Sequence, residues 1–318
     1  MSLHRLTRIV MGVPNVASTA AYYAEFGLSP TTGEPERTIA PQPTFATVDG
    51  GEQLSIVETP RRRLVELGVG ADDPDDLDRI AASLGALGLE TTREASSITA
   101  VEPGTEVLVR VEIAPRVTQE PTPTPSYNAP GVNTRQQERA PGILREGPVR
   151  PRKLGHVVLG STDQEFSHRF FRDGLGFKTS DTVPGIAAFM RCSTDHHNVL
   201  VQQAPLAFLH HTAWQVDDID EVGRGASAML EDNPERHAWG LGRHFIGSNF
   251  FWYLQDPAGN FSEYYSDLDC IVEDALWKPG VWEGARSLWA WGPPPPPSFL
   301  APEDLAGLMA GAHSDSNR

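Results

Sequence analysis

The stretch Leu154-Gly-His-Val-Val-Leu-Gly160 repeats an earlier stretch of the chain, Leu6-Thr-Arg-Ile-Val-Met-Gly12, which lies 148 residues before it. The aromatic pairs Phe170-Phe171 and Tyr22-Tyr23 follow these stretches at the same distance, and each pair leads to a Gly-Leu step. In each copy, an apolar strand pattern precedes a helix with paired aromatics on its buried face. The chain is therefore predicted to contain an internal duplication.

Each half also contains a shorter repeat of its own. A strand pattern at 65–71 leads into a helix at 73–87, and a second strand pattern at 208–216 leads into a helix at 217–230. Both helices begin with acidic residues, which suit the positive end of the helix dipole. The whole pattern predicts an α+β fold of four strand–helix–strand–strand–strand (βαβββ) units, two in each half.

Proline and glycine are concentrated between the two halves and near the C-terminus. The length of 318 residues fits two domains, and a proline-rich stretch without apolar periodicity is typical of a linker. We therefore predict an N-terminal domain at 1–120, a linker at 121–151, a C-terminal domain at 152–270 and a Trp- and Pro-rich tail at 271–318.

The net charge of −16 argues against nucleic acid as a partner, because phosphate binding needs clustered Lys and Arg. No apolar run is long enough to span a membrane, and the first residues lack the pattern of a secretory signal. Cys192 and Cys270 are too few and too far apart for a disulfide framework or a Cys-x-x-Cys metal site. The sequence thus predicts a cytoplasmic protein without a membrane partner.

Histidines are concentrated in the second half, where eight of the ten lie between positions 156 and 244. His156 and His211 occupy matching places on the first strands of the third and fourth units, and Glu263 lies on the last strand of the fourth. Two imidazoles and one carboxylate form the facial triad of non-haem Fe(II) oxygen chemistry. Zinc can take the same ligands in a hydrolytic site, and spacing alone does not separate the two metals.

The motifs of this half resemble a known family. Leu154-Gly-His156, Leu209-His-His211 and the run from Gly242-Arg-His244 through Tyr253 to Glu263 resemble the type I extradiol catechol dioxygenases of the vicinal oxygen chelate superfamily. The C-terminal signature of that family has a histidine, a tyrosine nine residues later and a glutamate ten residues beyond it. Both intervals are present here, and the resemblance covers residues 5 to about 270.

The resemblance implies two tandem domains, each a curled mixed sheet around a cleft, of which the C-terminal one is catalytic and binds metal. The N-terminal domain departs from the pattern, because Arg8 takes the place of His156 and the segment 103–108 lacks the carboxylate of the signature. We therefore expect the N-terminal domain to be a non-catalytic duplicate.

Carried over by position, the resemblance gives roles to single residues. The acid–base histidine would be His197 by strand register, or His196 if the length of the following loop is counted instead; we prefer His197, because loops change length more readily than strands change register. His210, beside the second ligand, is expected to point to the opposite face of its strand with a structural role. The metal ligands would be His156, His211 and Glu263, and the groups that bind the substrate oxygens would be His244 and Tyr253.

The implied activity is extradiol ring cleavage, in which both atoms of the co-substrate O2 enter an alkyl-, aryl- or carboxy-substituted catechol at Fe(II), with Mn(II) as the other metal. The family also implies a homo-oligomer. Arg243 is a candidate for binding a substrate carboxylate, and the tryptophans of the tail are candidates for covering the mouth of the cleft. The aromatic candidates for the pocket lining are Phe189, Trp214, Trp239, Phe245 and Phe250.

Two alternatives remain open at this point. One is a glyoxalase-type metal-dependent lyase or isomerase, which usually needs a fourth protein ligand; the corresponding place near 200–203 offers only apolar and amide side chains. The other is a metal-free small-molecule binding protein of the same fold. It would leave three buried polar side chains in need of other partners, which is costly.

Overall fold

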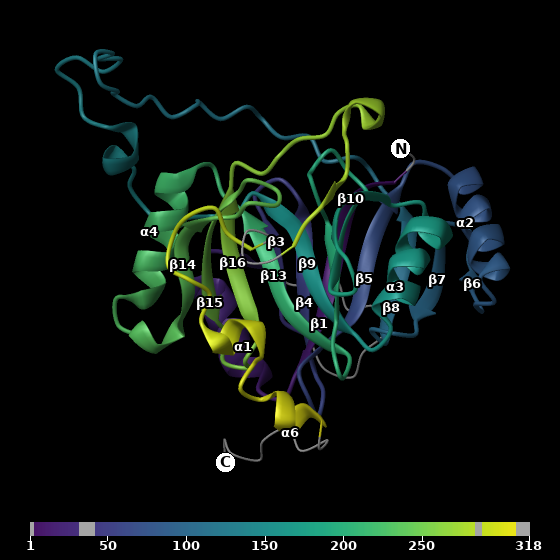
Figure 1. Ribbon diagram of the computed structural model, residues 1–318. Coiled ribbons are helices and arrows are strands. Elements are labelled where there is room, and N and C mark those ends of the chain that lie inside the picture. Colours follow the sequence, from purple (N-terminus) through teal and green to yellow (C-terminus); the bar gives the residue numbers. More distant parts are fainter. Residues whose placement is uncertain (1–2, 32–41, 284–287, 310–318) are drawn as a thin grey trace.

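Two curled β-sheets stand side by side in the molecule, one from each half of the chain (Figure 1). The structure is a computed structural model and describes residues 3–31, 42–283 and 288–309. The first sheet has eight strands in the order β2-β3-β4-β1-β5-β8-β7-β6. The second has nine strands in the order β14-β15-β16-β13-β9-β12-β11-β10-β17. The predicted α+β class is confirmed.

The N-terminal half contains two βαβββ units, as the repeats predict. The first consists of β1 (Leu3–Val13), α1 (Val16–Glu25), β2 (Ser29–Thr31), β3 (Thr44–Thr47) and β4 (Gly51–Glu58). The second consists of β5 (Arg63–Ala71), α2 (Pro74–Ala86), β6 (Thr92–Arg93), β7 (Ser97–Glu102) and β8 (Val107–Ile113).

The C-terminal half contains two more units of the same order. The third consists of β9 (Lys153–Ser161), α3 (Gln164–Arg169) continued by the π-helix η2 (Phe170–Leu175), β10 (Lys178–Val183), β11 (Ala187–Arg191) and β12 (Val199–Gln203). The fourth consists of β13 (Phe208–Gln215), α4 (Ile219–Leu230), the short η3 (Pro234–Arg236), β14 (His237–Arg243), β15 (Phe250–Gln255) and β16 (Phe261–Ser266).

The halves share one hydrophobic core, because α1 of the first unit packs against the C-terminal sheet. The ring of Phe26, just after α1, stacks on Tyr264 with 3.8 Å between centroids, and the Tyr264 hydroxyl donates to the Phe26 carbonyl at 2.6 Å. Tyr22 on α1 forms a 2.5 Å hydrogen bond with Ser262. The paired aromatics of the repeat thus join the two halves to each other.

The segments outside the four units contain little regular structure. In the segment of the chain that joins β8 to β9, η1 (Pro141–Leu144) is the single helical turn. After β16 come η4 (Asp274–Leu276), β17 (Gly280–Val281), α5 (Pro297–Leu300) and α6 (Leu305–Met309). β17 pairs with β10, so the tail adds an edge strand to the C-terminal sheet. Parts of the predicted tail, 284–287 and 310–318, lie outside the described residues.

Within the described ranges, every helix is too short or too polar to cross a membrane.

Candidate active site

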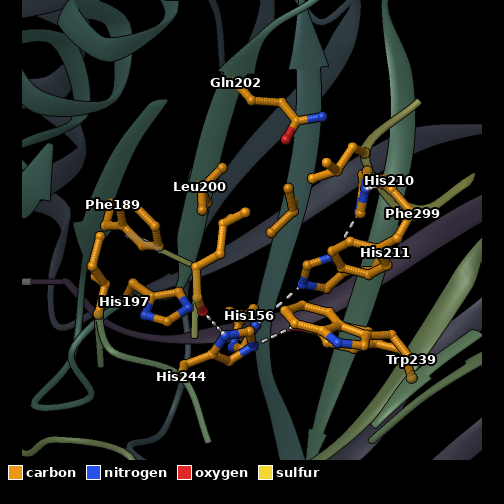
Figure 2. Close-up of a pocket in the computed structure, with 15 residues that line it drawn as sticks. His156, Phe189, His197, Leu200, Gln202, His210, His211, Trp239, His244 and Phe299 are labelled. Atoms are coloured by element: carbon orange, nitrogen blue, oxygen red, sulfur yellow. Dashed lines mark hydrogen bonds between the residues drawn. The ribbon is translucent and has the colours of Figure 1, made fainter. Parts of the chain in front are cut away.

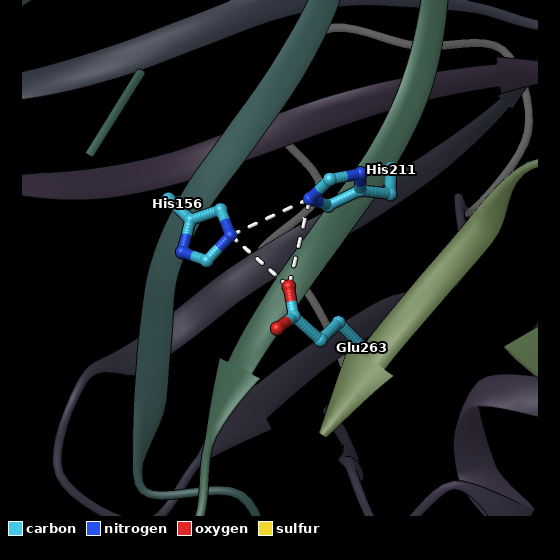
Figure 3. Close-up of side chains that lie close together, drawn as sticks. All are labelled: His156, His211 and Glu263. Carbon is cyan, nitrogen blue, oxygen red and sulfur yellow. Dashed lines mark hydrogen bonds and ion pairs between the residues drawn. The ribbon is translucent and has the colours of Figure 1, made fainter. Parts of the chain in front are cut away.

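Three neighbouring strands at the centre of the C-terminal sheet bring His156, His211 and Glu263 together (Figure 3). In the register, His156 on β9 pairs with Ala213 on β13, and Ala213 pairs with Glu263 on β16. Since side chains two residues apart on a strand share a face, His211 projects to the same side as Ala213, and hence to the side of His156 and Glu263. One ligand atom from each of the three lies within 4.8 Å of the others, and we name this set the His–His–Glu cluster.

The chemistry of the His–His–Glu cluster suits a divalent cation. His156 Nε2 lies 3.1 Å and His211 Nε2 3.5 Å from Glu263 Oε2, an oxygen that is buried and accepts no hydrogen bond among the described residues. The other oxygen of Glu263 accepts a 3.0 Å bond from the Asn249 amide, which fixes the carboxylate. Burial lowers the pKa of His211 well below its ordinary value, so this ring is neutral. A buried carboxylate facing two imidazole nitrogens is the donor set that non-haem iron and manganese sites use.

His244 and Tyr253 form a hydrogen-bonded pair beside this cluster. The Tyr253 hydroxyl lies 2.8 Å from His244 Nε2, and His244 Nδ1 lies 2.5 Å from the Leu288 carbonyl. A carbonyl only accepts, so Nδ1 carries the proton and Nε2 of the neutral ring accepts from Tyr253. Burial lowers the pKa of His244, and burial and Glu263 raise the pKa of Tyr253 well above its ordinary value. Both side chains are therefore uncharged at neutral pH.

The two adjacent histidines just before β12 take different positions, and Figure 2 shows the one that faces the pocket, His197. His197 lines the pocket, with its ring centroid 4.2 Å from that of His156. His196 lies behind it: its Nδ1 is 3.1 Å from His197 Nδ1, its Nε2 is 3.3 Å from Asp181 Oδ2, and Trp277 covers its ring. Burial lowers the pKa of His197 well below its ordinary value, with further effects from neighbouring histidines. The geometry favours His197 over His196 as the residue that can meet a ligand.

The expectation that His210 points away from the site is wrong. A register shift between Leu209 and His211 against β9 interrupts the alternation of β13, so both histidines turn to the pocket side. His210 Nδ1 lies 2.8 Å from His211 Nδ1, and His210 Nε2 lies 2.8 Å from the Phe299 carbonyl. Burial lowers the pKa of His210 to about 4, so the ring is neutral.

A pocket of about 110 Å³ opens over the cluster, and most of its other lining is apolar. Phe189 and Trp239 line it as predicted. The tail also contributes, as expected, but through side chains that are not tryptophan. The apolar and amide lining residues are Val158, Phe189, Leu200, Gln202, Trp239, Ile246, Leu288, Phe299 and Leu300.

Three candidates for the lining, Trp214, Phe245 and Phe250, and the candidate carboxylate-binding residue Arg243 lie outside the pocket. Trp214 is fully buried in the main core, and Phe245 packs on Trp282. The Arg243 guanidinium lies over the Phe250 ring at 4.3 Å and pairs with Asp267 at 2.6 Å. Arg243 is therefore already neutralised outside the pocket, and the prediction that it receives a substrate carboxylate is not supported by its position.

Sequence reasoning missed Asn249, Asp181 and the tail residues Leu288 and Phe299. Asn249 precedes β15 as an ordinary loop residue, and nothing in its neighbours indicates that it holds Glu263. The tail carbonyls belong to the backbone, which has no sequence signature. The repeated His-His pairs at 196–197 and 210–211 are the one sequence feature that indicates hydrogen bonds between adjacent histidines.

Comparison with known proteins agrees with this architecture. Residues 153–264 match the family model of the glyoxalase/bleomycin resistance protein/dioxygenase superfamily. Two solved structures superpose over most of the chain. The Mn(II)-bound glyoxalase from Novosphingobium aromaticivorans has a TM-score of 0.72 at 24% identity and covers 93% of each chain. Homoprotocatechuate 2,3-dioxygenase from Arthrobacter globiformis has a TM-score of 0.73 at 17% identity and covers 94% of this chain and 91% of its own. At these identities the likeness concerns the fold, which is that of the vicinal oxygen chelate superfamily.

Sequence relatives narrow the assignment. A protein named metapyrocatechase 2 from Cupriavidus necator is 31% identical over 315 residues, which span 94% of this chain and 92% of that protein. Two others match about half of their length: a manganese-dependent 2,3-dihydroxybiphenyl 1,2-dioxygenase from Geobacillus genomosp. 3, 28% identical over 42% of this chain and 45% of its own, and an iron-dependent extradiol dioxygenase from Rhodococcus jostii, 31% identical over 39% and 46%. The chain belongs to the type I extradiol catechol dioxygenases, enzymes that open catechol rings with dioxygen.

Proposed function

We propose that this chain is an Fe(II)-dependent extradiol dioxygenase that opens single-ring catechols with apolar substituents. The observation that carries the proposal is the convergence of the His–His–Glu cluster, His197 and the His244–Tyr253 pair on one apolar pocket. We assign the metal ligands to His156, His211 and Glu263 and the substrate and proton contacts to the other three side chains.

A divalent metal held by the three ligands would leave open positions at which both oxygens of a catechol and dioxygen can bind. Related enzymes include an iron-dependent and a manganese-dependent one, so the ligands alone do not choose between these metals. We propose Fe(II) as the working metal and Mn(II) as the alternative to test against it.

Tyr253 and His244 would together take up a proton of the substrate. The Tyr253 hydroxyl donates to His244 Nε2, so its oxygen lone pairs are available to accept from a catechol hydroxyl. The high pKa of Tyr253 keeps it a phenol, and the low pKa of His244 keeps it a neutral acceptor. A proton that enters at the tyrosine oxygen can thus continue to His244 without leaving a phenolate behind.

His197 would provide the acid–base group, since it lines the pocket next to His156. Asp181 accepts from His196 Nε2, so His196 Nδ1 accepts from His197 Nδ1 and leaves His197 Nε2 without a proton. A neutral histidine of this kind first takes a proton and later returns it to the oxygen atom that needs it.

The pocket itself supports the proposed substrate class. Its volume of about 110 Å³ is close to that of a cavity of roughly 150 Å³ that holds one benzene ring. Among the described lining residues there is no Lys or Arg to neutralise a substituent carboxylate. A single ring with methyl or other apolar substituents therefore fits this lining better than a carboxylated or two-ring catechol.

The glyoxalase-type alternative has less support. Among the described residues, the possible metal cluster contains three ligands and no fourth carboxylate, histidine or cysteine. The cytoplasmic location, the homo-oligomer and the domain limits at 1–120, 121–151, 152–270 and 271–318 stay predictions.

The decisive test is ring cleavage by the protein loaded anaerobically with either Fe(II) or Mn(II). Each form is mixed with oxygenated buffer and with catechol, alkyl-substituted catechols, a carboxylated catechol or a dihydroxybiphenyl. We expect oxygen uptake matched by a yellow product, fastest with Fe(II) and the alkylcatechols. Cleavage by the Mn(II) form alone would correct the metal, and a preference for the carboxylated or two-ring compound would correct the substrate class.

A further inference from the structure

The C-terminal tail reaches the interior of the active site at α5. Phe299 is buried, with its ring centroid 4.8 Å from that of His210 and 4.6 Å from that of Tyr253 (Figure 2). Its backbone carbonyl oxygen accepts a 2.8 Å hydrogen bond from His210 Nε2. A carbonyl has no proton to give, so His210 Nε2 must carry the proton.

That proton position determines the next one along the chain of hydrogen bonds. In neutral His210 the proton at Nε2 leaves Nδ1 as an acceptor, and Nδ1 lies 2.8 Å from His211 Nδ1. His211 must therefore carry its own proton at Nδ1. Its Nε2 is then a bare lone pair, and it faces Glu263 and His156.

We propose that His210 is a positioning residue, which couples the Phe299 carbonyl to His211 and holds that ring in the tautomer able to bind metal through Nε2. Histidines that bind metal generally donate their second N–H to an oxygen acceptor, which fixes ring and tautomer. Here the acceptor is a second neutral imidazole, and the oxygen that orients it lies in the tail. The inference rests on the proposed role of His211 as a ligand.

The other ligand histidine gives a contrast within the same cluster. His156 Nδ1 is buried and has no hydrogen-bond partner among the residues that the structure describes. Among the described residues, His211 is thus the one of these two imidazoles whose Nδ1 forms a hydrogen bond. A matching arrangement occurs at His244, whose Nδ1 donates to the Leu288 carbonyl of the tail. Two tail carbonyls therefore determine the tautomers of two pocket histidines.

The tail is held in place by a residue from the N-terminal half. The buried Arg62 forms a bidentate ion pair with Asp304, just beyond α5, and also donates to the Leu209 carbonyl at 2.5 Å. Leu209 immediately precedes the two histidines on β13. One guanidinium thus connects the strand that carries His210 to the segment that carries the Phe299 carbonyl.

The first test uses the unaltered full chain without metal. Long-range ¹H–¹⁵N NMR on histidine-labelled protein reports which ring nitrogen of each histidine carries the proton. We expect His211 to be protonated at Nδ1 and His210 at Nε2. A His211 ring protonated at Nε2 would overturn the proposal, and this measurement does not depend on whether the protein cleaves catechols.

The second test compares two substitutions that separate the two hydrogen bonds of His210. The Oδ1 of His210→Asn stands at the place of Nδ1 and can still accept from His211. The amide nitrogen of His210→Gln stands at the place of Nε2 and can still donate to Phe299, but it offers His211 no acceptor. The exposed His237→Gln is the matched control.

Fe(II) affinity, measured anaerobically by competition with a chelator, should fall about 10- to 100-fold in His210→Gln and by less than about threefold in His210→Asn and His237→Gln. Equal affinity of the two His210 variants would contradict the proposal. The protein could show the expected tautomers and the expected affinities and yet not cleave catechols. That result would support the positioning role of His210 and contradict the proposed function.

Discussion

The strands that carry the His–His–Glu cluster have direct counterparts in the N-terminal half, and the counterparts carry a different set of charges. In the C-terminal sheet, the register joins His156, Ala213 and Glu263 across β9, β13 and β16. In the N-terminal sheet, it joins Arg8, Gly68 and Arg110 across β1, β5 and β8.

The second histidine has a counterpart as well. His211 lies two residues before Ala213, and Glu66 lies two residues before Gly68. The N-terminal positions are thus occupied by an Arg–Glu–Arg cluster, in which Arg8 donates to Glu66 Oε1 at 2.9 Å and Arg110 donates to the same oxygen at 3.2 Å.

The two halves share one fold but differ in how the charges at these equivalent positions are balanced. Two guanidinium groups and one carboxylate leave the Arg–Glu–Arg cluster with one positive charge. A divalent cation bound by two imidazole lone pairs and one carboxylate would give the His–His–Glu cluster the same single positive charge. The N-terminal half supplies its cations from side chains, whereas the C-terminal half leaves a buried carboxylate oxygen that accepts no hydrogen bond among the described residues.

The largest expected effect comes from removing one member of each cluster at equivalent positions. His211→Ala should weaken Fe(II) binding by more than about 100-fold, because it removes a ligand. The loss should exceed that of a residue that only forms a hydrogen bond with a ligand. Glu66→Ala should leave metal binding unchanged, because its cluster is complete without metal. Metal content after gel filtration and chelator competition measures both. Metal retained by His211→Ala would remove the basis of the comparison.

A second substitution separates chemistry from metal binding within the C-terminal half. His197→Ala should keep its metal and still bind catechol, while kcat falls about 10²- to 10⁴-fold, the usual contribution of a general acid–base group. Stopped-flow mixing of the anaerobic substrate complex with oxygen measures the loss. An unchanged kcat would move the acid–base role to another residue, and His196→Ala, which removes the side chain behind the pocket, is the matched comparison.

The sequence was sufficient to predict the duplication and the cluster, because both follow from regular spacing. The alternation of strand side chains and the shared register place His156, His211 and Glu263 on one face once the four units are recognised. The same alternation failed at His210, where a register shift in β13 turns the side chain back to the pocket. A one-residue irregularity depends on tertiary packing and leaves no periodic signal.

The remaining contacts of the site could not be predicted for a related reason. The carbonyls of Leu288 and Phe299 act through the backbone, and their positions depend on how the tail docks. Arg243 beside His244 suggested a carboxylate site, but Asp267, which lies 24 residues later in the chain, neutralises its charge. Charge pairing between distant segments appears only once the chain is folded.

Two arginines of the N-terminal half are expected to contribute different amounts to the stability of the folded chain. Arg62 is fully buried at the junction with the tail, whereas the side chain of Arg8 is 44% exposed. Arg62→Met should lower the free energy of unfolding by about 3 kcal/mol, because it removes a buried guanidinium that pairs with Asp304 and donates to the Leu209 carbonyl. Arg8→Met should cost less than about 1 kcal/mol, as exposed ion pairs do. Urea denaturation of both variants measures the difference, and equal losses would show that the tail junction is no more important than the surface pair.

The smallest expected effect concerns pH and a buried histidine on β1, outside both clusters. Burial lowers the pKa of His4 in the folded chain, and its ring nitrogens form no hydrogen bond among the described residues. The unfolded chain then binds a proton more readily, so the stability contributed by neutral His4 is complete above the ordinary histidine pKa of about 6.5 and is lost as the pH falls below it. Asp72, 4.0 Å away, reduces the effect by favouring the charged ring. Between about pH 7.5 and pH 5.5, the urea midpoint of the wild-type protein should therefore decrease more than that of His4→Gln, which cannot titrate. Parallel decreases would mean that His4 is protonated as easily in the folded chain as in the unfolded one, and the acid sensitivity of the molecule would then belong to the histidines of the C-terminal half.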